Sequence, residues 1–238
     1  MIELLRVESL NVGYGKFHII FDVSFEVKER TIFTIVGPNG GGKSTLLNGI
    51  MGIATVFSGR VLYKGQDITR VPPHEKSKYG IGYTPQTDNI FPGLTVMENL
   101  MMAAYGLGES MARDRIEKVL AYYPALRRRI DAKARNLSGG ERQMLAISMN
   151  LMRDPEFIIL DEPTSGLAPI IAKDLLKRIV GMRDELKKTI LLVEQNAKAA
   201  LEVSDDAMLL VSGRSEFIGK AQALLKDEEL GRKYLGVK

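Results

Sequence analysis

The sequence predicts an α/β fold built on a mainly parallel sheet, with an N-terminal antiparallel β subdomain and an inserted α-helical subdomain. Apolar and polar residues alternate from Leu4 to Val27, which is typical of half-buried strands. Farther along, short apolar runs alternate with amphipathic segments, and this order favours a parallel sheet flanked by helices. The stretch 87–154 has helical spacing and few strand-forming runs.

Composition excludes several classes of protein. The chain has 238 residues, of which 45% are hydrophobic and 26% charged, so it is long enough and apolar enough for a globular fold of one domain or two closely joined ones. It has no cysteine, which rules out disulfides and thiolate zinc sites. The apolar runs are far short of the ~20 residues of a membrane span, and the first ten residues lack the pattern of a secretion signal, so we expect a cytoplasmic chain.

The first part of the chain predicts strands around a glycine-rich loop. The triplet 13–15 is expected to be a turn inside the first strand pair. The run 31–36 is a continuous apolar strand, 37–42 is the loop, and 44–53 has helical spacing. Two further short strands are predicted at 60–63 and 81–83.

The second part predicts the insert and the rest of the sheet. Helices are expected at 95–105, 112–123 and 139–152, and then a strand at 156–160, a helix at 170–186 and a strand at 189–193. A hairpin formed by 207–211 and 216–218 and some short helices complete the chain. We therefore predict a core of residues 1–86 and 155–238, which includes the antiparallel subdomain, and a helical subdomain of residues 87–154.

The glycine-rich loop has the pattern of a phosphate-binding loop. The pattern G-x-x-x-x-G-K-[ST] is met between a predicted strand and a predicted helix, and the expected binding residues are Gly37, Pro38, Asn39, Gly40, Gly41, Gly42, Lys43, Ser44 and Thr45. Glycines let backbone N–H groups surround phosphate oxygens, and the helix directs its positive end at the same anion. Lys43 would reach the β and γ phosphates and Ser44 would bind Mg²⁺. In a chain with 23 glycines an ordinary turn can match by accident. The strand and helix on either side make that alternative weak.

Two carboxylates follow the apolar run at 157–160. The carboxyl ends of parallel strands open onto the ligand crevice, so Asp161 and Glu162 should emerge beside the phosphate loop. Side chains alternate along a strand, which lets the two acids act separately. We assign Asp161 to the metal and Glu162 to the attacking water, as phosphoryl transfer requires. Taken alone, the pair could equally begin a solvated turn.

A second anion site is suggested by the segment LSGGE. Ser138 and Glu141 are spaced as a capping box at the start of a helix, which by itself is a sufficient structural explanation. Gly139 and Gly140 in addition leave the backbone of that helix start bare, where an anion could bind.

Taken together, these motifs resemble the ATP-binding subunit of ABC transporters over nearly the whole chain. GPNGGGKST is similar to the Walker A motif of that family, LSGGE to its signature and FIILDEP to its Walker B motif. By the same resemblance Tyr14 would stack on adenine, and Gln86 would contact Mg²⁺ and water. The alternatives for these two are an ordinary hairpin tyrosine and an ordinary loop residue.

The resemblance also implies cofactors and partners. ATP and Mg²⁺ would bind the Walker A motif of one subunit, and Ser138, Gly139 and Gly140 of a second ATP-binding subunit, homologous or identical, would close over them in a head-to-tail dimer. The helical insert would dock on an integral membrane permease at the cytoplasmic face of the inner or plasma membrane. No nucleic-acid partner is expected.

Two departures from the family pattern help to indicate which subfamily the chain resembles. Gln195 stands where the family usually has a switch histidine, and Ala168 where it has an aspartate. An amide can bond a phosphate but cannot carry a charge or a proton as imidazole does. Catalysis is therefore assigned to Glu162 with Gln195. DEPTSGLAP, LLVEQNAKAALEVS and the segment 233–236 resemble an ATPase of branched-chain amino-acid importers.

Two other functions stay open on the sequence alone. The run 113–135 has eight basic and three acidic residues, which is most simply a solvated helical face but is also compatible with an anionic partner. A soluble ABC-type ATPase acting on nucleic acid or ribosomes is therefore the alternative. A nucleotide-sensing module without turnover is the third reading, because of Gln195 and Ala168.

Overall fold

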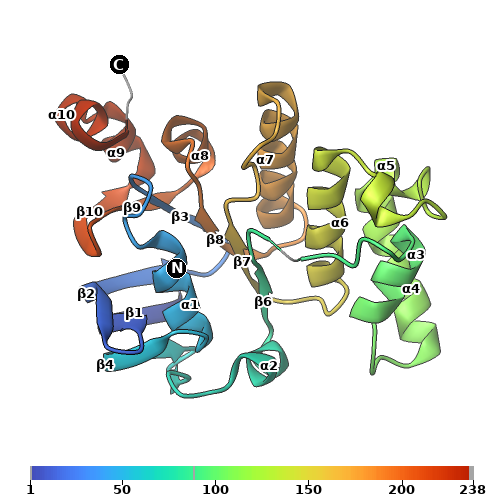
Figure 1. Cartoon of the computed structure of the whole chain (residues 1–238), viewed down its shortest axis with the longest axis horizontal. Coiled ribbons are helices and arrows are strands. Elements are labelled where there is room, and N and C mark those ends of the chain that lie inside the picture. Colours follow the sequence, from blue (N-terminus) through green and yellow to red (C-terminus); the bar gives the residue numbers. More distant parts are fainter. Residues whose placement is uncertain (1, 88, 236–238) are drawn as a thin grey trace.

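A computed structural model describes residues 2–87 and 89–235 and confirms the predicted fold class. Asp88, inside the predicted insert, and residues 236–238, at the end of the predicted core, lie outside the described residues. Two sheets lie side by side, and helices flank the larger one (Figure 1).

The smaller sheet is antiparallel and comes from the first part of the chain. Its strand order is β2-β1-β4-β5, with bounds Glu3–Tyr14 for β1, Phe17–Lys28 for β2, Thr55–Tyr63 for β4 and Gln66–Asp67 for β5. The predicted turn is displaced by two residues, because Gly13 and Tyr14 still pair with β2 and only residues 15–16 form the turn. The fourth strand is longer than predicted, since it begins at Thr55 and bends at Gly59, where φ is 88°.

The larger sheet has six strands in the order β10-β9-β3-β8-β7-β6, and four of its five pairings are parallel. The bounds are Ile32–Val36 for β3, Ile81–Thr84 for β6, Phe157–Asp161 for β7, Thr189–Val193 for β8, Asp206–Val211 for β9 and Arg214–Lys220 for β10. Because β3, β8, β7 and β6 are parallel neighbours, the loops that follow them leave from the same edge.

Helices follow most strands of this sheet. Their bounds are Lys43–Met51 for α1, Pro73–Lys76 for α2, Val96–Ala103 for α3, Glu109–Tyr122 for α4, Pro124–Arg127 for α5, Gly139–Leu151 for α6, Pro169–Asp184 for α7, Ala197–Val203 for α8, Ala221–Lys226 for α9 and Glu228–Leu230 for α10. Short 3₁₀ turns cover Ser77–Tyr79 and Ala134–Asn136, and a π turn covers Gly231–Leu235. The helices α3 to α6 all lie between β6 and β7 in the chain, and of these α3, α4 and α6 were predicted, whereas α5 was not; α2 and α8 were not predicted either.

The strands β3, β7 and β8 of the six-stranded sheet are buried on both faces, which explains their apolar sequences. On β7, Ile158 and Leu160 face the core that includes α6, α7 and α8, while Phe157 and Ile159 face the core shared with α1 and the antiparallel sheet. The strands β3 and β8 divide their residues in the same way. The sheet is therefore held rigidly between two packed layers.

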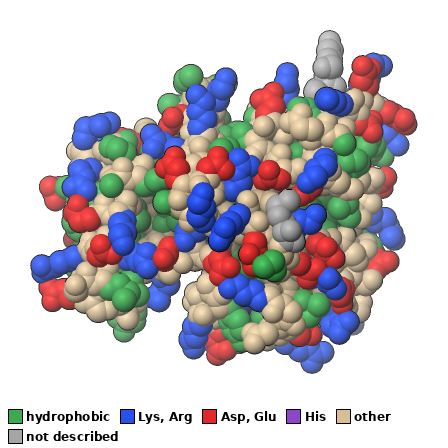
Figure 2. All heavy atoms as spheres, turned by 180° about the vertical axis from the view of Figure 1, so that it is seen from behind, with side chains coloured by type: hydrophobic (Ala, Val, Ile, Leu, Met, Phe, Trp, Pro, Cys, Tyr) green, Lys and Arg blue, Asp and Glu red, His purple; other side chains and the backbone are tan. Residues whose placement is uncertain are grey.

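Charges are mixed rather than segregated over the face seen in Figure 2, where basic and acidic side chains alternate. The basic run 113–135 follows this pattern, because five of its eight cations pair with an acid: Arg113 with Glu109, Arg115 with Asp154, Lys118 with Asp114, Arg127 with Glu117 and Arg129 with Glu141. Among the helices of the described residues, none combines the length and apolar character that a membrane span requires.

Candidate functional site

The glycine-rich loop connects the end of β3 to the start of α1, in the context that the sequence predicted. Gly37 has φ 154°, and a Cβ there would lie 2.0 Å from the carbonyl oxygen of Leu210. Gly42, the N-cap of α1, has φ 99°. Both positions therefore need glycine. Among the described residues, no side chain caps the start of α1, and the first turn of this helix, Lys43–Met51, has no acid, so its N–H groups remain available to an anion.

Lys43 is folded back over the loop. Its Nζ donates to the carbonyl oxygens of Gly37 at 3.0 Å and Pro38 at 3.2 Å and lies 3.7 Å from a carboxylate oxygen of Glu162. The side chain is only 4% exposed, so the ammonium is held within the loop by carbonyl groups and one acid.

Asp161 and Ser44 meet as a metal site would require. Asp161 is the last residue of β7, and its Oδ1 accepts a hydrogen bond of 3.3 Å from the Ser44 hydroxyl. Burial raises the pKa of Asp161, and the nearby charge of Glu162 adds to that effect, while the bond from Ser44 opposes it. A cation placed here would relieve the cost of keeping this carboxylate ionised.

Glu162 lies just beyond β7 and turns in a different direction. Its φ of 47° is unusual for a residue with a side chain. Besides Lys43, its carboxylate contacts Gln86, whose Nε2 donates to Oε2 at 2.9 Å. The predicted loop glutamine, which follows β6, is therefore brought to the predicted water-polarising acid.

Most of the predicted phosphate-site residues line one open cavity of about 460 Å³, although Gly37, Pro38 and Asp161 lie outside its lining. Its lining combines the phosphate loop with the ends of three neighbouring strands and consists of Ile19, Asn39, Gly40, Gly41, Gly42, Lys43, Ser44, Thr45, Gln86, Glu162, Ser165 and Gln195. Gln195, two residues beyond β8, lies in the same lining as Glu162. Ile19 and Ser165 were not predicted, because neither residue type signals phosphate chemistry.

Tyr14 and the LSGGE segment lie outside that lining. The Tyr14 ring is 42% exposed, and its hydroxyl accepts a 2.8 Å bond from Asn48 of α1. Ser138 forms the predicted capping box with Glu141, through bonds of 3.3 and 2.8 Å. Gly139 and Gly140 lie against residues at and before the start of α7, since a Cβ on them would be 3.1 Å from Leu167 and 2.5 Å from Ile171.

One buried acid next to the cavity lining was not predicted from the sequence. Glu194 directly follows β8, is 1% exposed, and accepts bonds from the N–H of Thr164 at 3.0 Å and from its hydroxyl at 2.8 Å. Burial raises the pKa of Glu194 to about 7, although the bonds from Thr164 oppose the shift. The rule that located Asp161, an acid at the end of a buried parallel strand, also applies to Glu194.

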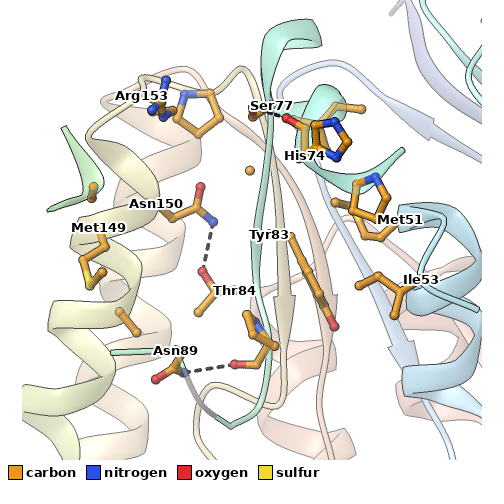
Figure 3. A pocket seen from close by; sticks show the side chains of 17 residues that line it. Met51, Ile53, His74, Ser77, Tyr83, Thr84, Asn89, Met149, Asn150 and Arg153 are labelled. Atoms are coloured by element: carbon orange, nitrogen blue, oxygen red, sulfur yellow. Dashed lines mark hydrogen bonds between the residues drawn. The ribbon is translucent and has the colours of Figure 1, made fainter. Parts of the chain in front are cut away.

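A separate groove of about 500 Å³ runs between β6 and the helices of the insert. In Figure 3, Asn150 of α6 points at Thr84 of β6, and Asn89 points back at the chain just beyond that strand. Asn150 donates to Thr84 Oγ1 at 2.9 Å, and Asn89 to the carbonyl oxygen of Pro85 at 3.0 Å. The groove therefore borders the segment that leads to Gln86.

Comparison with known proteins decides the family. The sequence matches the ABC transporter family over residues 20–165. It is 51% identical over 234 residues to a protein of Archaeoglobus fulgidus named as a probable branched-chain amino acid transport ATP-binding protein, LivF, a match that covers 98% of this chain and 99% of that relative. The chain belongs to the ABC transporter family.

Two further likenesses agree. The high-affinity branched-chain amino acid transport ATP-binding protein BraG of Pseudomonas aeruginosa is 38% identical over 98% of this chain and 100% of its own length. The crystal structure of the ADP conformation of an ATP-binding cassette of an ABC transporter superposes with a TM-score of 0.88 at 30% identity, covering 98% of each chain. This chain is thus an ATP-binding cassette, the ATPase of an ABC transporter.

Proposed function

We propose that this ABC transporter ATPase powers the import of branched-chain or other hydrophobic amino acids through partner permeases. The observation that carries the catalytic part is the Glu162 carboxylate, which lies between Lys43 and Gln86 at the phosphate loop. The names of LivF and BraG support the solute class.

ATP would bind with its phosphates on the loop that begins α1. The glycines bring backbone N–H groups to the phosphate oxygens, and Lys43 would exchange its bonds to the loop carbonyls for the β and γ phosphates. Tyr14, whose exposed ring is braced by Asn48, would stack on the adenine.

The donor set fits Mg²⁺ bound together with phosphates. Among the described residues, no three His, Cys, Asp or Glu side chains gather to hold a metal. The proposed ligands are the Ser44 hydroxyl, the Gln86 amide and the Asp161 carboxylate, a set that needs substrate oxygens to be complete, as Mg²⁺ sites often do. When bound, Mg²⁺ would supply positive charge to the β and γ phosphates.

Hydrolysis would depend on Glu162 and Gln195. Glu162 polarises the water for in-line attack on the γ phosphorus while Lys43 offsets the developing charge. Gln195, in the lining of the same cavity, donates a hydrogen bond to the γ phosphate. Its amide cannot move a proton, so Glu162 carries that part of the reaction.

The site would be completed by a second ATP-binding subunit, homologous or a second copy. Ser138, Gly139 and Gly140 are outside the lining of their own chain's cavity, so in a head-to-tail pair they would close over the ATP of the other subunit. The groove in Figure 3 would receive a permease segment at the cytoplasmic side of the membrane, because apolar side chains such as Met51, Ile53 and Met149 line it.

The variant Glu162→Gln tests the catalytic proposal. It keeps the size of the side chain, so ATP affinity should stay within a few-fold, while turnover falls by at least 100-fold and an ATP-bound dimer accumulates. Size-exclusion chromatography with ATP and a phosphate-release assay measure both. Normal steady-state hydrolysis by this variant would refute the role of Glu162.

Transport coupling needs a separate experiment. Co-purification of the intact complex from membranes should yield permease subunits, and the solute-binding protein that stimulates its ATPase activity should bind leucine, isoleucine or valine. A complex stimulated only by an unrelated solute would leave the ATPase assignment intact and overturn the solute class.

A further inference from the structure

The turn that follows β7, residues 162–165, is hydrogen-bonded to Val193, the last residue of β8, and to Glu194, which follows it. The N–H of Glu162 donates to the carbonyl oxygen of Val193 at 2.9 Å, and Thr164 gives both its N–H and its hydroxyl to the carboxylate of Glu194. The turn itself is closed by the N–H of Ser165, which donates to the carbonyl oxygen of Glu162 at 3.1 Å. Four hydrogen bonds thus fix four residues.

This anchoring matters because the turn is strained at its first residue. Glu162 has φ 47°, and such a conformation persists only where the surrounding structure imposes it. The same backbone conformation directs the Glu162 carboxylate to Lys43 and Gln86. If the turn relaxed toward negative φ, the carboxylate would leave those partners.

We propose that Glu194 is a positioning residue for ATP hydrolysis. Its hydrogen bonds with Thr164 hold the strained turn in the conformation in which Glu162 faces the phosphate loop. The inference rests on the proposed role of Glu162. Glu194 does not line the cavity around the phosphate loop, so it acts through Thr164 rather than on the nucleotide.

The chemistry of the pair predicts which substitutions preserve it. A carboxylate accepts from both donors of Thr164. A glutamine can accept from the N–H through Oε1 and donate to the hydroxyl oxygen through Nε2, so the geometry survives the loss of charge. Alanine leaves both donors of Thr164 without their partner in a buried place, and the turn loses its anchor.

The experiment compares four variants of the full chain with wild type. Glu194→Ala should lower kcat at least tenfold with ATP affinity unchanged within twofold, and Glu194→Gln should restore kcat to within threefold of wild type. Thr164→Val removes only the hydroxyl and should have an intermediate effect. Thr189→Val is the matched control, because Thr189 is also buried and bonded, to the N–H of Arg30, but at the opposite end of β8.

Amide exchange gives a second readout that needs no turnover. Glu194→Ala should accelerate hydrogen exchange in the peptide covering 162–165 and leave the phosphate loop and α1 unchanged, whereas Glu194→Gln should retain protection. If Glu194→Ala does not fold, the comparison of Thr164→Val with Thr189→Val decides. Equal kcat in that pair would overturn the proposal, as would unchanged exchange or unchanged kcat in Glu194→Ala.

The variant Glu162→Gln separates the two claims. If it hydrolyses ATP normally, the role of Glu162 fails whatever Glu194 does. If it is inactive while Glu194→Ala keeps the wild-type rate, only the positioning role fails.

Discussion

The two helix starts that carry glycine motifs, at α1 and at α6, are built in opposite ways. The start of α1 has Gly42 as its N-cap and no side chain that satisfies its N–H groups. The start of α6 has a complete capping box, in which Ser138 and Glu141 bond to each other's backbone. The first has no side-chain partner for its N–H groups, while in the second the capping box bonds the N–H groups of Ser138 and Glu141 and leaves those of Gly139 and Gly140. The two glycine-rich helix starts therefore differ in how many backbone donors they leave for an anion.

The largest effect, a loss of ATP affinity, should come from a substitution at the start of α1. Among the described residues, Lys43 supplies the only ammonium in the lining of the phosphate-loop cavity. We expect Lys43→Ala to lower ATP affinity by about 100-fold, as for loss of a charge-assisted contact in a mostly buried site. Isothermal titration with ATP measures this. Lys133→Ala, an exposed lysine near the start of α6, is the control and should bind ATP normally. Equal affinities of both variants would contradict the difference between the two regions.

Two acids, Glu194 and Glu141, should make the free energy of unfolding change with pH in opposite directions. The pKa of Glu194 is raised to about 7 by burial, so the folded chain holds this proton more tightly than the unfolded chain. The free energy of unfolding should therefore fall by roughly 3 kcal/mol as pH rises from about 4.5 to about 7. Urea unfolding across that range should show this slope in wild type and lose it in Glu194→Gln.

Glu141 gives the opposite case. The N–H of Ser138 lowers the pKa of Glu141, so its stabilising contribution is present above the unfolded pKa and is lost as pH falls through the folded one. Glu141→Gln should thus destabilise the chain slightly at neutral pH and by less in acid. If both acids changed the free energy of unfolding with pH in the same direction, Glu141 would not stabilise the start of α6 through its bond with the N–H of Ser138.

The glycines of the two motifs should tolerate a methyl group unequally. Gly42→Ala forces an alanine into φ 99° and brings Cβ to 2.7 Å from Cδ1 of Ile20, which should cost about 2 kcal/mol. Gly139→Ala is helical, and its Cβ would lie 3.1 Å from the flexible end of Leu167, so stability should change by less than about 1 kcal/mol. Thermal unfolding distinguishes the two variants, and equal losses of stability would contradict the strain that we assign to the phosphate loop at Gly42.

Removal of the helix cap should have a small effect on stability and none on ATP binding. Ser138→Ala should reduce stability by about 1 kcal/mol and leave ATP affinity of the isolated chain unchanged, because Ser138 lies outside that chain's own cavity. Denaturant unfolding and ATP titration of the same sample test both statements. Weaker ATP binding by the isolated variant would mean that the two regions are not separate.

The parts of the site that could be predicted are those tied to a local rule. The phosphate loop follows from its spacing between strand and helix, and Asp161 and Glu162 follow from their place after an apolar strand. Glu194 also follows an apolar strand, but its side chain bonds to Thr164, and no local pattern distinguishes such a buried acid from one that faces the ligand. The bracing of Tyr14 by Asn48 depends on how α1 packs across the antiparallel sheet, and no local pattern contains that information.

The fold was predictable to a similar degree. Apolar runs located the strands of the larger sheet within a residue or two, because its central strands β3, β7 and β8 are buried on both faces. Buried Lys76 could not be foreseen: lysine usually faces water, but here its Nζ donates to the carbonyl oxygen of Ile50 in the last turn of α1. The start of β4 was missed because Gly59 interrupts the alternation that marks a strand.

The adjacency of β6 and β7 has a mechanical consequence. The four helices from α3 to α6 leave the sheet at the end of β6 and rejoin it at β7, the neighbouring strand, and α6 also packs in the core that includes β7. The chain that joins these helices to β6 passes through Gln86, which donates a hydrogen bond to Glu162. A displacement of the helices relative to the sheet would therefore be transmitted along this connection to the residue that contacts the acid beside the phosphate loop.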